Sequence, residues 1–415
     1  MLRSATSPES RAFMVLGDGR RSNGRCLVRV GRMEDHGAAA DSATPDELVG
    51  GLLHIDLAAV KANYRQIARA VKPAACGACI KSNAYGLGLR PVAMALWQAG
   101  CRTFFVAVPA EGIELRAILP DAVVYVLDGL LPRLAPTYLA HGLRPALSSL
   151  DEVKEWADFS LANKVRAKAA LHLDTGLNRL GLSPGEVRHL AARRELLDAF
   201  EIALIVSHLA CADEPSHELN DRQRQAFDLL RSSLPEAPAS LSNTPGALIG
   251  QDFAYDLVRP GIGIYGGNPF AQRSNPMRPV VHLYAAILQV RDIRAGESVG
   301  YGATWTADRD SRIAIVAAGY GDGLPRALSS PARGGPAHAY LGGQFAPIVG
   351  RVSMDLLAID VTDVSPAFAR RGVRAELIGD HVTVDDMARW AGTIPYEILT
   401  SLGSRYSRLY SGADA

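Results

Sequence analysis

The chain has 415 residues, more than one ordinary compact domain uses, and this length favours two or three domains. Its 44 Lys and Arg residues nearly balance 43 Asp and Glu residues, so the net charge of +1 gives no electrostatic reason to expect a nucleic acid or an anionic membrane as partner. No apolar run approaches the ~18 residues that a membrane-spanning helix requires. A hydrophobic content of 48% with 21% charged residues is typical of a globular protein with a large core.

The first 50 residues lack the pattern of a secretory signal peptide. Their longest apolar run, Phe13–Leu16, is too short for the apolar part of such a peptide, and arginines lie on both sides of it. We expect residues 1–50 to be a disordered basic leader, or a segment preceding a true start at Met33, because low hydrophobicity with charge cannot form a core. The five cysteines are an odd, sparse set that favours a reducing cytoplasm over a disulfide framework.

Between about residues 76 and 266, short apolar runs alternate with segments of helical periodicity, the pattern of repeated βα units. One such segment places Val153, Trp156, Ala157 and Leu161 on a common face. Eight parallel strands with helical crossovers favour an α/β fold with a closed (β/α)8 barrel over an open sheet, and we predict this barrel over residues 51–280. The eight predicted strands are Gly77–Ser82, Thr103–Val108, Val123–Leu127, Arg144–Ser148, Lys168–Asp174, Ala203–Leu209, Ala239–Asn243 and Leu257–Tyr265.

The segments on either side of this region have a different pattern of apolar and turn residues. Leu52–Ile55 is predicted to be a further strand, which could join the second domain, and Asp56 caps a helix that follows it. After about residue 280, alternating runs such as Ala285–Val290 and Leu356–Val361 lie between glycine-rich turns. We therefore predict a mostly-β C-terminal domain over residues 281–415.

Lys81 lies at the carboxyl end of the first predicted barrel strand, where barrel enzymes place catalytic groups. Its neighbours Cys79 and Ile80 would partly desolvate the side chain and favour the neutral amine that Schiff-base chemistry needs. By position alone, a surface lysine at a strand end is the better interpretation, so the assignment depends on the rest of the sequence.

Metal binding has little support in the sequence. Cys76 and Cys79 have the spacing of a redox or zinc motif, but no second pair accompanies them, and we interpret them as small buried residues. The ten histidines have no ligand spacing, and we predict no metal site.

A series of sequence blocks from about residue 52 onward resembles the alanine racemase family. One block would be weak evidence, but this many in the family's order and at its approximate spacings are highly specific. The blocks are Ile80–Gly88, His172–Gly181, Ser207–His208, Ser242–Thr244, Val258–Gly266, Val299–Thr304, Gly319–Gly323 and Gly350–Asp355. The resemblance implies an enzyme that interconverts L-alanine and D-alanine with pyridoxal 5′-phosphate, either to supply D-alanine for peptidoglycan or to degrade it.

The resemblance also implies which residues bind the cofactor. Lys81 would form a Schiff base with it, and Arg259 would face its pyridine nitrogen, which stays unprotonated because a guanidinium has no acceptor and does not deprotonate. Barrels commonly bind a phosphate at the loops after strands seven and eight. Tyr406 and Tyr410 are both candidates for a further tyrosine near the phosphate, and we choose Tyr410. The other implied contacts are Tyr85, Arg179, His208, Asn243, Thr244, Gly261 and Ile262.

Racemisation requires an acid/base group on each face of the substrate Cα atom. By resemblance, Lys81 serves the proton of D-alanine and Tyr301 that of L-alanine. In the family, the domain that carries the tyrosine covers the barrel of the partner subunit, which implies a homodimer with shared active sites. The implied substrate contacts are Arg179, Tyr320, Met354 and Asp355.

One departure from the family pattern concerns Arg179. Many members have a lysine at the position of His172, and its carbamate positions the arginine; here His172 itself or a bound anion would have to do so. A racemase of serine or lysine remains an alternative, since the motifs hardly discriminate between substrates. Tyr301, Tyr320 and Met354 count against a non-catalytic pyridoxal-phosphate-binding barrel protein, and the basic Arg259 counts against a decarboxylase of the same fold class.

Overall fold

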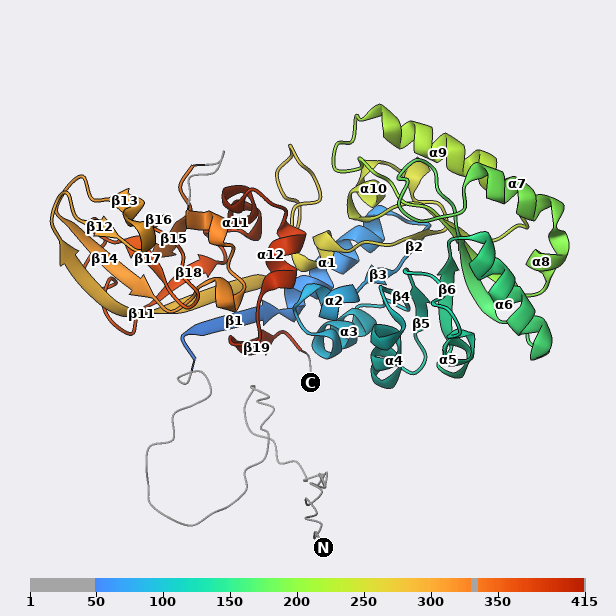
Figure 1. Ribbon diagram of the computed structural model, residues 1–415, viewed down its shortest axis with the longest axis horizontal. Helices are drawn as coiled ribbons and strands as arrows, with labels where there is room; N and C mark the ends of the chain where they lie inside the picture. The colour runs from blue at the N-terminus through green and yellow to red at the C-terminus, as the bar shows by residue number, and fades with distance from the viewer. Residues whose placement is uncertain (1–48, 330–334, 414–415) are drawn as a thin grey trace, which may run out of the picture. The chain divides into compact units, whose positions relative to one another are not determined.

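The computed structural model describes residues 49–329 and 335–413 (Figure 1). The predicted leader, residues 1–50, lies outside the described residues except for its last two. In the described ranges, no helix is both long and apolar enough to cross a bilayer.

The N-terminal part of the fold is a parallel sheet whose strands follow one another in chain order. Helices connect the strands and lie outside them (Figure 1). The seven strands of this sheet are β3 (Ala78–Cys79), β4 (Thr103–Val106), β5 (Val123–Val126), β6 (Leu143–Leu147), β7 (Lys168–His172), β8 (Glu201–Val206) and β9 (Ala239–Ser240).

An eighth strand position closes the sheet. β10 (Leu257–Val258) pairs in parallel with β2 (Ala75–Cys76), which continues through Gly77 into β3. On its other side, the Arg259 N–H donates to the Ser242 carbonyl at 2.9 Å, beyond the end of β9. The predicted α/β fold with an N-terminal barrel is thereby confirmed, although its closing strands are only two residues long.

The helices of the barrel follow the predicted amphipathic pattern in most places. Asp56 caps α1 by accepting hydrogen bonds from the Ala58 and Ala59 N–H groups, as expected. In α6 the predicted face is partly wrong, because Leu161 is 63% exposed while Val153, Trp156 and Ala157 are buried. The helices are α1 (Leu57–Ala70), α2 (Lys81–Tyr85), α3 (Leu89–Gln98), α4 (Pro109–Ile118), α5 (Ala135–Ala140), α6 (Leu150–Ala162), α7 (Pro184–Ala192), α8 (Arg194–Asp198), α9 (Glu218–Arg231) and α10 (Thr244–Ile249).

The C-terminal part is mostly β, as predicted. Its main sheet has the strand order β14-β17-β16-β15-β18-β11-β1-β19, and a further pairing of β14 with β11 closes six of these strands into a ring. Two short helices, α11 (Val384–Ala391) and α12 (Pro395–Ser401), complete it. The strands are β11 (Val281–Ile293), β12 (Ser298–Val299), β13 (Trp305–Thr306), β14 (Ser311–Val316), β15 (His338–Leu341), β16 (Gln344–Val349), β17 (Leu357–Asp360), β18 (Arg374–Ile378) and β19 (Ser407–Ser411).

The strand that precedes the barrel, β1 (Gly51–Asp56), lies in this C-terminal sheet. It runs antiparallel to β11 and parallel to β19, with Leu52 opposite Tyr284 and Ser407. The chain therefore begins its described part in the sheet to which it returns at the end.

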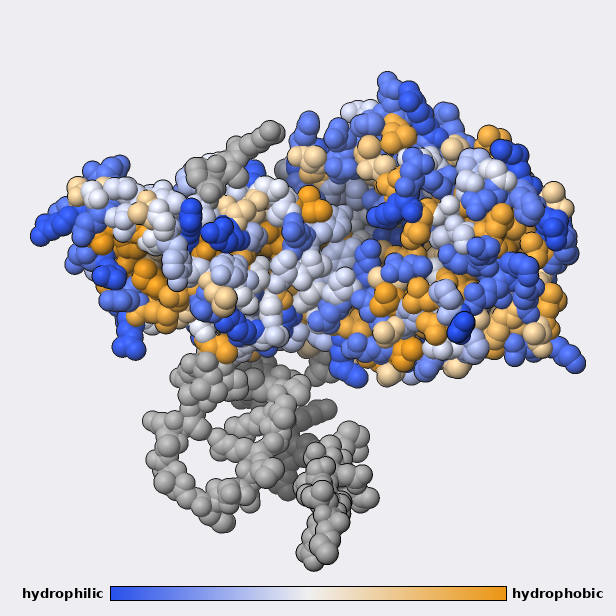
Figure 2. Space-filling view, viewed as in Figure 1, coloured by the Kyte–Doolittle hydropathy of each residue, from blue (hydrophilic) through white to orange (hydrophobic). Residues whose placement is uncertain are grey.

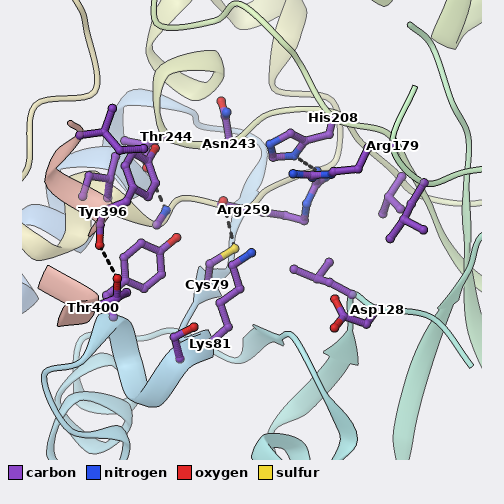
Figure 3. A pocket seen from close by; sticks show the side chains of 18 of the residues that line it. Cys79, Lys81, Asp128, Arg179, His208, Asn243, Thr244, Arg259, Tyr396 and Thr400 are labelled. Carbon is purple, nitrogen blue, oxygen red and sulfur yellow. Dashed lines mark hydrogen bonds between the residues drawn. The ribbon is translucent and has the colours of Figure 1, made fainter. Parts of the chain in front are cut away.

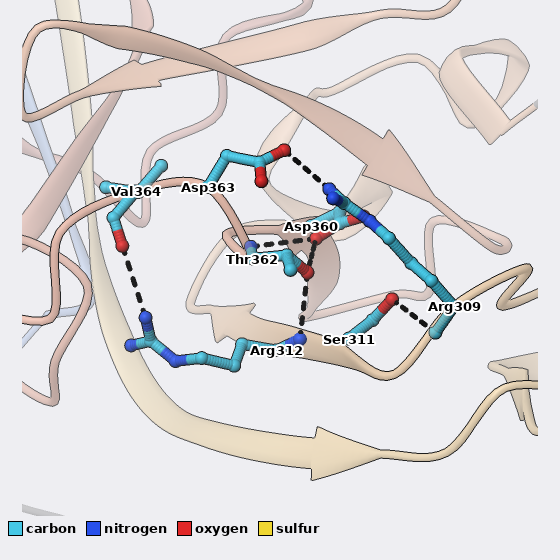
Figure 4. A network of polar contacts seen from close by, with 7 residues as sticks. All are labelled: Arg309, Ser311, Arg312, Asp360, Thr362, Asp363 and Val364. Carbon is cyan, nitrogen blue, oxygen red and sulfur yellow. Dashed lines mark hydrogen bonds and ion pairs between the residues drawn. The ribbon is translucent and has the colours of Figure 1, made fainter.

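Polar contacts fix the far end of this sheet. The Arg312 N–H donates to the Thr362 hydroxyl at 3.0 Å, and its guanidinium donates to the Val364 carbonyl at 3.1 Å (Figure 4). Arg309 pairs with Asp363 beside them. These contacts tie β14 to the segment that follows β17. Figure 2 shows apolar residues gathered over these C-terminal strands, whereas polar and apolar residues are more evenly mixed over the barrel.

Candidate active site

A cavity of about 730 Å³ opens at the carboxyl ends of the barrel strands. Figure 3 shows the side chains of Lys81, Arg179, His208 and Arg259 around it. Nine of the residues predicted from the sequence line this cavity: Lys81, Tyr85, Arg179, His208, Asn243, Thr244, Arg259, Gly261 and Ile262.

Lys81 begins an unusual turn. The four residues after it, Ser82 to Tyr85, all have positive φ values between 53° and 55°, although none of them is glycine. L-amino acids disfavour this left-handed conformation by about 1–2 kcal/mol each and visit it mostly as single residues. The turn therefore depends on contacts from the surrounding structure, and it ends at Gly86, whose φ of 81° suits a residue without a Cβ atom.

Tyr85 and Gly261 approach each other closely at one end of the cavity. A Cβ atom at position 261 would lie 2.2 Å from the Tyr85 hydroxyl oxygen, so only glycine fits there. The Gly261 N–H donates to the Thr244 hydroxyl at 2.8 Å, and the Tyr85 ring stacks on Tyr265 with 4.4 Å between centroids. Asn243 caps the short helix α10 by accepting from the Gly246 N–H. The backbone of two loops and a phenol thus converge on this end.

Arg259 is buried in the wall of the cavity, with 5% of its surface exposed. Its guanidinium donates to the Ser240 carbonyl at 2.8 Å and to the Ser207 carbonyl at 2.6 Å. Burial lowers the pKa of Arg259 to about 10, so the side chain keeps its charge at neutral pH. The backbone carbonyls compensate for lost hydration without neutralising the charge.

Two histidines beside this arginine are neutral. Burial, followed by the charge of Arg259, lowers the pKa of His208 well below its ordinary value, and His208 Nδ1 lies 3.4 Å from an Arg259 nitrogen. The same causes lower the pKa of His172 to about 4, and its Nδ1 lies 3.2 Å from the Ser148 hydroxyl. The charge of Arg179 contributes in both cases. Cationic and neutral side chains therefore dominate this part of the cavity, which suits an anionic ligand.

The predicted C-terminal residues do not line this cavity. Tyr301, Tyr320 and Met354 are 73%, 42% and 55% exposed, and the Asp355 carboxylate accepts a hydrogen bond from Arg405. Two backbone hydrogen bonds join their loops, from the Tyr320 N–H to the Ser353 carbonyl and from the Gly321 N–H to the Met354 carbonyl.

Tyr301 lies close to these loops. It shares a shallow depression of about 280 Å³ with Ser353 and Leu356, which flank Met354 and Asp355. The four predicted residues thus belong to neighbouring loops on one exposed surface of the C-terminal domain.

The choice of Tyr410 is corrected by the structure. Its hydroxyl donates to the Leu87 carbonyl at 2.9 Å, and Tyr410 is not among the residues that line the cavity. Tyr396, in the first turn of α12, lines the cavity instead, with its ring 5.9 Å from that of Tyr85. Sequence reasoning also missed Cys79, Asp128 and Thr400, which line the cavity as well. Pro395 marks the start of the helix that carries Tyr396, but nothing local indicates where that helix docks.

Comparisons with known proteins agree with this geometry. The model of the alanine racemase N-terminal domain matches residues 55–269, and that of the alanine racemase C-terminal domain matches residues 280–410. An alanine racemase of Methylobacterium nodulans is 49% identical over 87% of this chain and 96% of its own length. A catabolic alanine racemase of Agrobacterium fabrum is 44% identical over 87% of this chain and 92% of its own.

Solved structures lead to the same family. The crystal structure of alanine racemase from Bartonella henselae, with covalently bound pyridoxal phosphate, has a TM-score of 0.83 and 39% identity, and the match covers 87% of this chain and 99% of that one. The biosynthetic alanine racemase of Pseudomonas aeruginosa has a TM-score of 0.79 and 35% identity, covering 88% and 99%. The resemblance seen in the sequence is confirmed: the chain belongs to the alanine racemase family of isomerases.

Proposed function

We propose that this protein interconverts L-alanine and D-alanine with pyridoxal 5′-phosphate, using Lys81 and Tyr301 as the two acid/base groups. The observation that carries the proposal is the position of Lys81 in the cationic cavity at the carboxyl ends of the barrel strands. Relatives of this protein include one described as biosynthetic and one described as catabolic. A reversible racemisation serves the supply of D-alanine as well as its degradation.

The residues around the cavity fit this cofactor. The cavity volume of about 730 Å³ lies within the range usual for cofactor sites. Tyr85 and the backbone at Gly261 approach each other closely at one end of the cavity, which Thr244 and Tyr396 also line, and we place the phosphate at this end. Lys81 supplies the amine for covalent attachment, which the Bartonella henselae relative has in its crystal structure.

Pyridoxal phosphate supplies, when bound, an electron-withdrawing ring that makes the Cα proton of an attached amino acid acidic. Arg259 would tune this property, because a guanidinium that keeps its charge offers only donors to the ring nitrogen and would leave it unprotonated. The neutral His208 beside Arg259 brings no competing charge. Bound beside Arg259, the ring would be a weak electron sink, which would favour return of a proton to Cα over transfer of the amino group.

Lys81 and Tyr301 then exchange protons with the two faces of the substrate Cα. In one protomer Tyr301 is 73% exposed and does not line the cavity, so the site lacks its second base. We propose that the cluster of Tyr301, Tyr320, Met354 and Asp355 covers the barrel mouth of a second copy. A two-fold homodimer with shared sites completes both cavities in the same way.

The domain boundaries follow the same proposal. We assign residues 51–280 to the cofactor-binding barrel and residues 281–415 to the domain that carries Tyr301. β1 is the exception, since its pairing with β11 and β19 joins it to the second domain.

A racemisation assay with L-alanine, L-serine and L-lysine tests the proposed substrate. We expect a strong preference for alanine in the wild type. Lys81→Ala should lose both the activity and the visible absorption band that covalent attachment of the cofactor produces. Faster turnover of serine or lysine would instead support a racemase of that amino acid, and cofactor binding without turnover of any of the three would support a non-catalytic role.

A further inference from the structure

The local backbone preferences of its own residues do not explain the left-handed turn Ser82–Tyr85. Asparagine and glycine enter this conformation readily, but serine, alanine and tyrosine do not, and here such residues occupy three of its four positions. The φ and ψ values at Ser82 are 53° and 51°, directly after Lys81. Any relaxation of Ser82 toward negative φ would change the backbone direction at the residue that the proposed function needs to be placed most accurately.

Several contacts hold the later part of the turn. The Asn83 side chain accepts from the Leu89 N–H at 2.7 Å, and the Tyr85 ring packs between Tyr265 and Tyr396. From β19, Arg408 donates to the Gly86 carbonyl at 2.6 Å.

The beginning of the turn, beside Lys81, is held by Glu111. One carboxylate oxygen of Glu111 accepts from the Ser82 N–H at 2.6 Å, and the other accepts from the Ala107 N–H at 2.8 Å. Glu111 lies in the first turn of α4, so its own position is fixed by the helix that follows β4. The carboxylate thus links the ends of two adjacent barrel strands, β3 and β4, through charge-assisted hydrogen bonds.

We propose that Glu111 is a positioning residue for Lys81: it holds Ser82 in the left-handed conformation and thereby sets the direction in which the Lys81 amine enters the cavity. The inference rests on the proposed function, in which Lys81 carries the cofactor and exchanges a proton. It predicts that a side chain outside the cavity controls cofactor affinity and turnover.

The chemistry of the two hydrogen bonds explains why a carboxylate is needed. Both partners of Glu111 are N–H donors, so each requires an acceptor oxygen. Glutamine has the same shape but only one oxygen, and its NH2 group cannot accept. Glu111→Gln therefore leaves one of the two N–H groups facing another donor while it preserves the packing of α4.

The test compares Glu111→Gln with Glu114→Gln, an exposed glutamate one turn further along α4, in the holoenzyme. For Glu111→Gln we expect an apparent dissociation constant for pyridoxal phosphate about 10-fold higher, kcat for alanine lower by about 10-fold or more, and a weaker visible circular dichroism band of the bound cofactor. Glu114→Gln should match the wild type in all three. The dichroism band reports cofactor orientation, which a loss of global stability alone does not change.

A rescue variant separates positioning from general support of the fold. Glycine enters the left-handed region without strain, so Ser82→Gly should make the turn less dependent on the carboxylate. We expect Ser82→Gly/Glu111→Gln to recover most of the lost cofactor affinity and dichroism. The double variant also decides the case in which Glu111→Gln alone does not fold: a folded, cofactor-binding double variant supports the proposal, and one that fails to fold or to bind contradicts it.

The failure of this inference is distinguishable from failure of the proposed function. A wild type that neither binds pyridoxal phosphate nor turns over alanine would refute the proposed function itself. A wild type that does both, with Glu111→Gln equal to Glu114→Gln or not improved by Ser82→Gly, would refute only the role of Glu111.

Discussion

At the scale of single residues, burial decides the charge of the groups around the cavity. Arg259 keeps its charge because its ordinary pKa is so high that a decrease to about 10 leaves it protonated. Histidine begins near neutrality, so the same burial makes His172 and His208 neutral. Arg259 therefore stays charged, and His172 and His208 stay neutral, over the physiological pH range.

His172 makes a testable contribution to the pH dependence of stability. Its pKa falls from 6.5 in the unfolded chain to about 4 in the fold, so the unfolded state binds the proton first as the pH decreases. Above pH ~6.5 His172 is neutral in both states and takes nothing from the free energy of unfolding. Between pH ~6.5 and ~4 that free energy decreases by up to about 3 kcal/mol, because only the unfolded state binds the proton. Denaturant unfolding of the cofactor-free protein at pH 7 and pH 5 measures it.

His172→Gln should lose less unfolding free energy over that interval than the wild type, by about 2 kcal/mol. His189→Gln, at an exposed position on α7, serves as the control and should keep the wild-type difference. Equal pH dependence in His172→Gln and His189→Gln would show that His172 does not contribute.

Tyr301→Phe tests the second base. The variant keeps the ring but lacks the hydroxyl, and a general base typically contributes ~10²–10⁴-fold to the rate. We expect racemisation to fall by about that factor while the cofactor band remains. Exchange of the α-proton with deuterated water, followed by NMR, should persist for D-alanine and be lost for L-alanine. Equal loss of exchange for both enantiomers would contradict the assignment of separate faces.

At the scale of elements, the closing turn of the barrel depends on the absence of a side chain. The loop after β10 approaches α2 so closely that a methyl group at Gly261 would overlap the Tyr85 hydroxyl. Displacement of either group would disturb the end of the cavity that we propose for the phosphate.

Gly261→Ala should therefore raise the dissociation constant of pyridoxal phosphate by about 10-fold or more, since overpacking typically costs ~1–3 kcal/mol. Gly250→Ala, after α10, is a matched control, because a Cβ atom there meets nothing within 4 Å. Spectroscopic titration of both variants with the cofactor measures the difference. A Gly261→Ala variant that binds as tightly as Gly250→Ala would exclude this close approach as a requirement of the site.

At the scale of the whole molecule, the exposed Tyr301 does not line the cavity around Lys81 within one chain. If a dimer shares its sites, a hybrid of Lys81→Ala and Tyr301→Phe subunits has one site with both substitutions and one with neither. Random mixing of equal amounts gives half hybrids, so about a quarter of all sites should be intact.

Two nearly inactive variants should therefore regain about a quarter of the wild-type activity after they are unfolded together and refolded. Each variant refolded alone provides the control. If Lys81 and Tyr301 acted within one chain, no hybrid would contain an intact site, and the mixture would remain as inactive as its components.

The sequence alone determined the order of the barrel strands and the cap of α1, because these depend on local patterns, and its resemblance to the alanine racemase family implied nine residues of the cavity. Alternation of strand and helix sets which residues end each strand, and parallel strands bring those ends together at one mouth. The sequence motifs that contain Lys81 and Arg259 therefore bring both side chains to the cavity at this mouth.

Only the tertiary structure decided which tyrosine of the C-terminal region reaches the cavity, where β1 pairs, and how the turn after Lys81 is held. Tyr396 and Tyr410 carry the same phenol group. The docking of α12 against the barrel brings Tyr396, and not Tyr410, to the cavity. β1 and β19 lie about 350 residues apart along the chain and are joined by parallel backbone pairing that exists only in the folded chain. The left-handed turn contradicts the local preference of its residues, so contacts with distant residues such as Glu111 must override that preference.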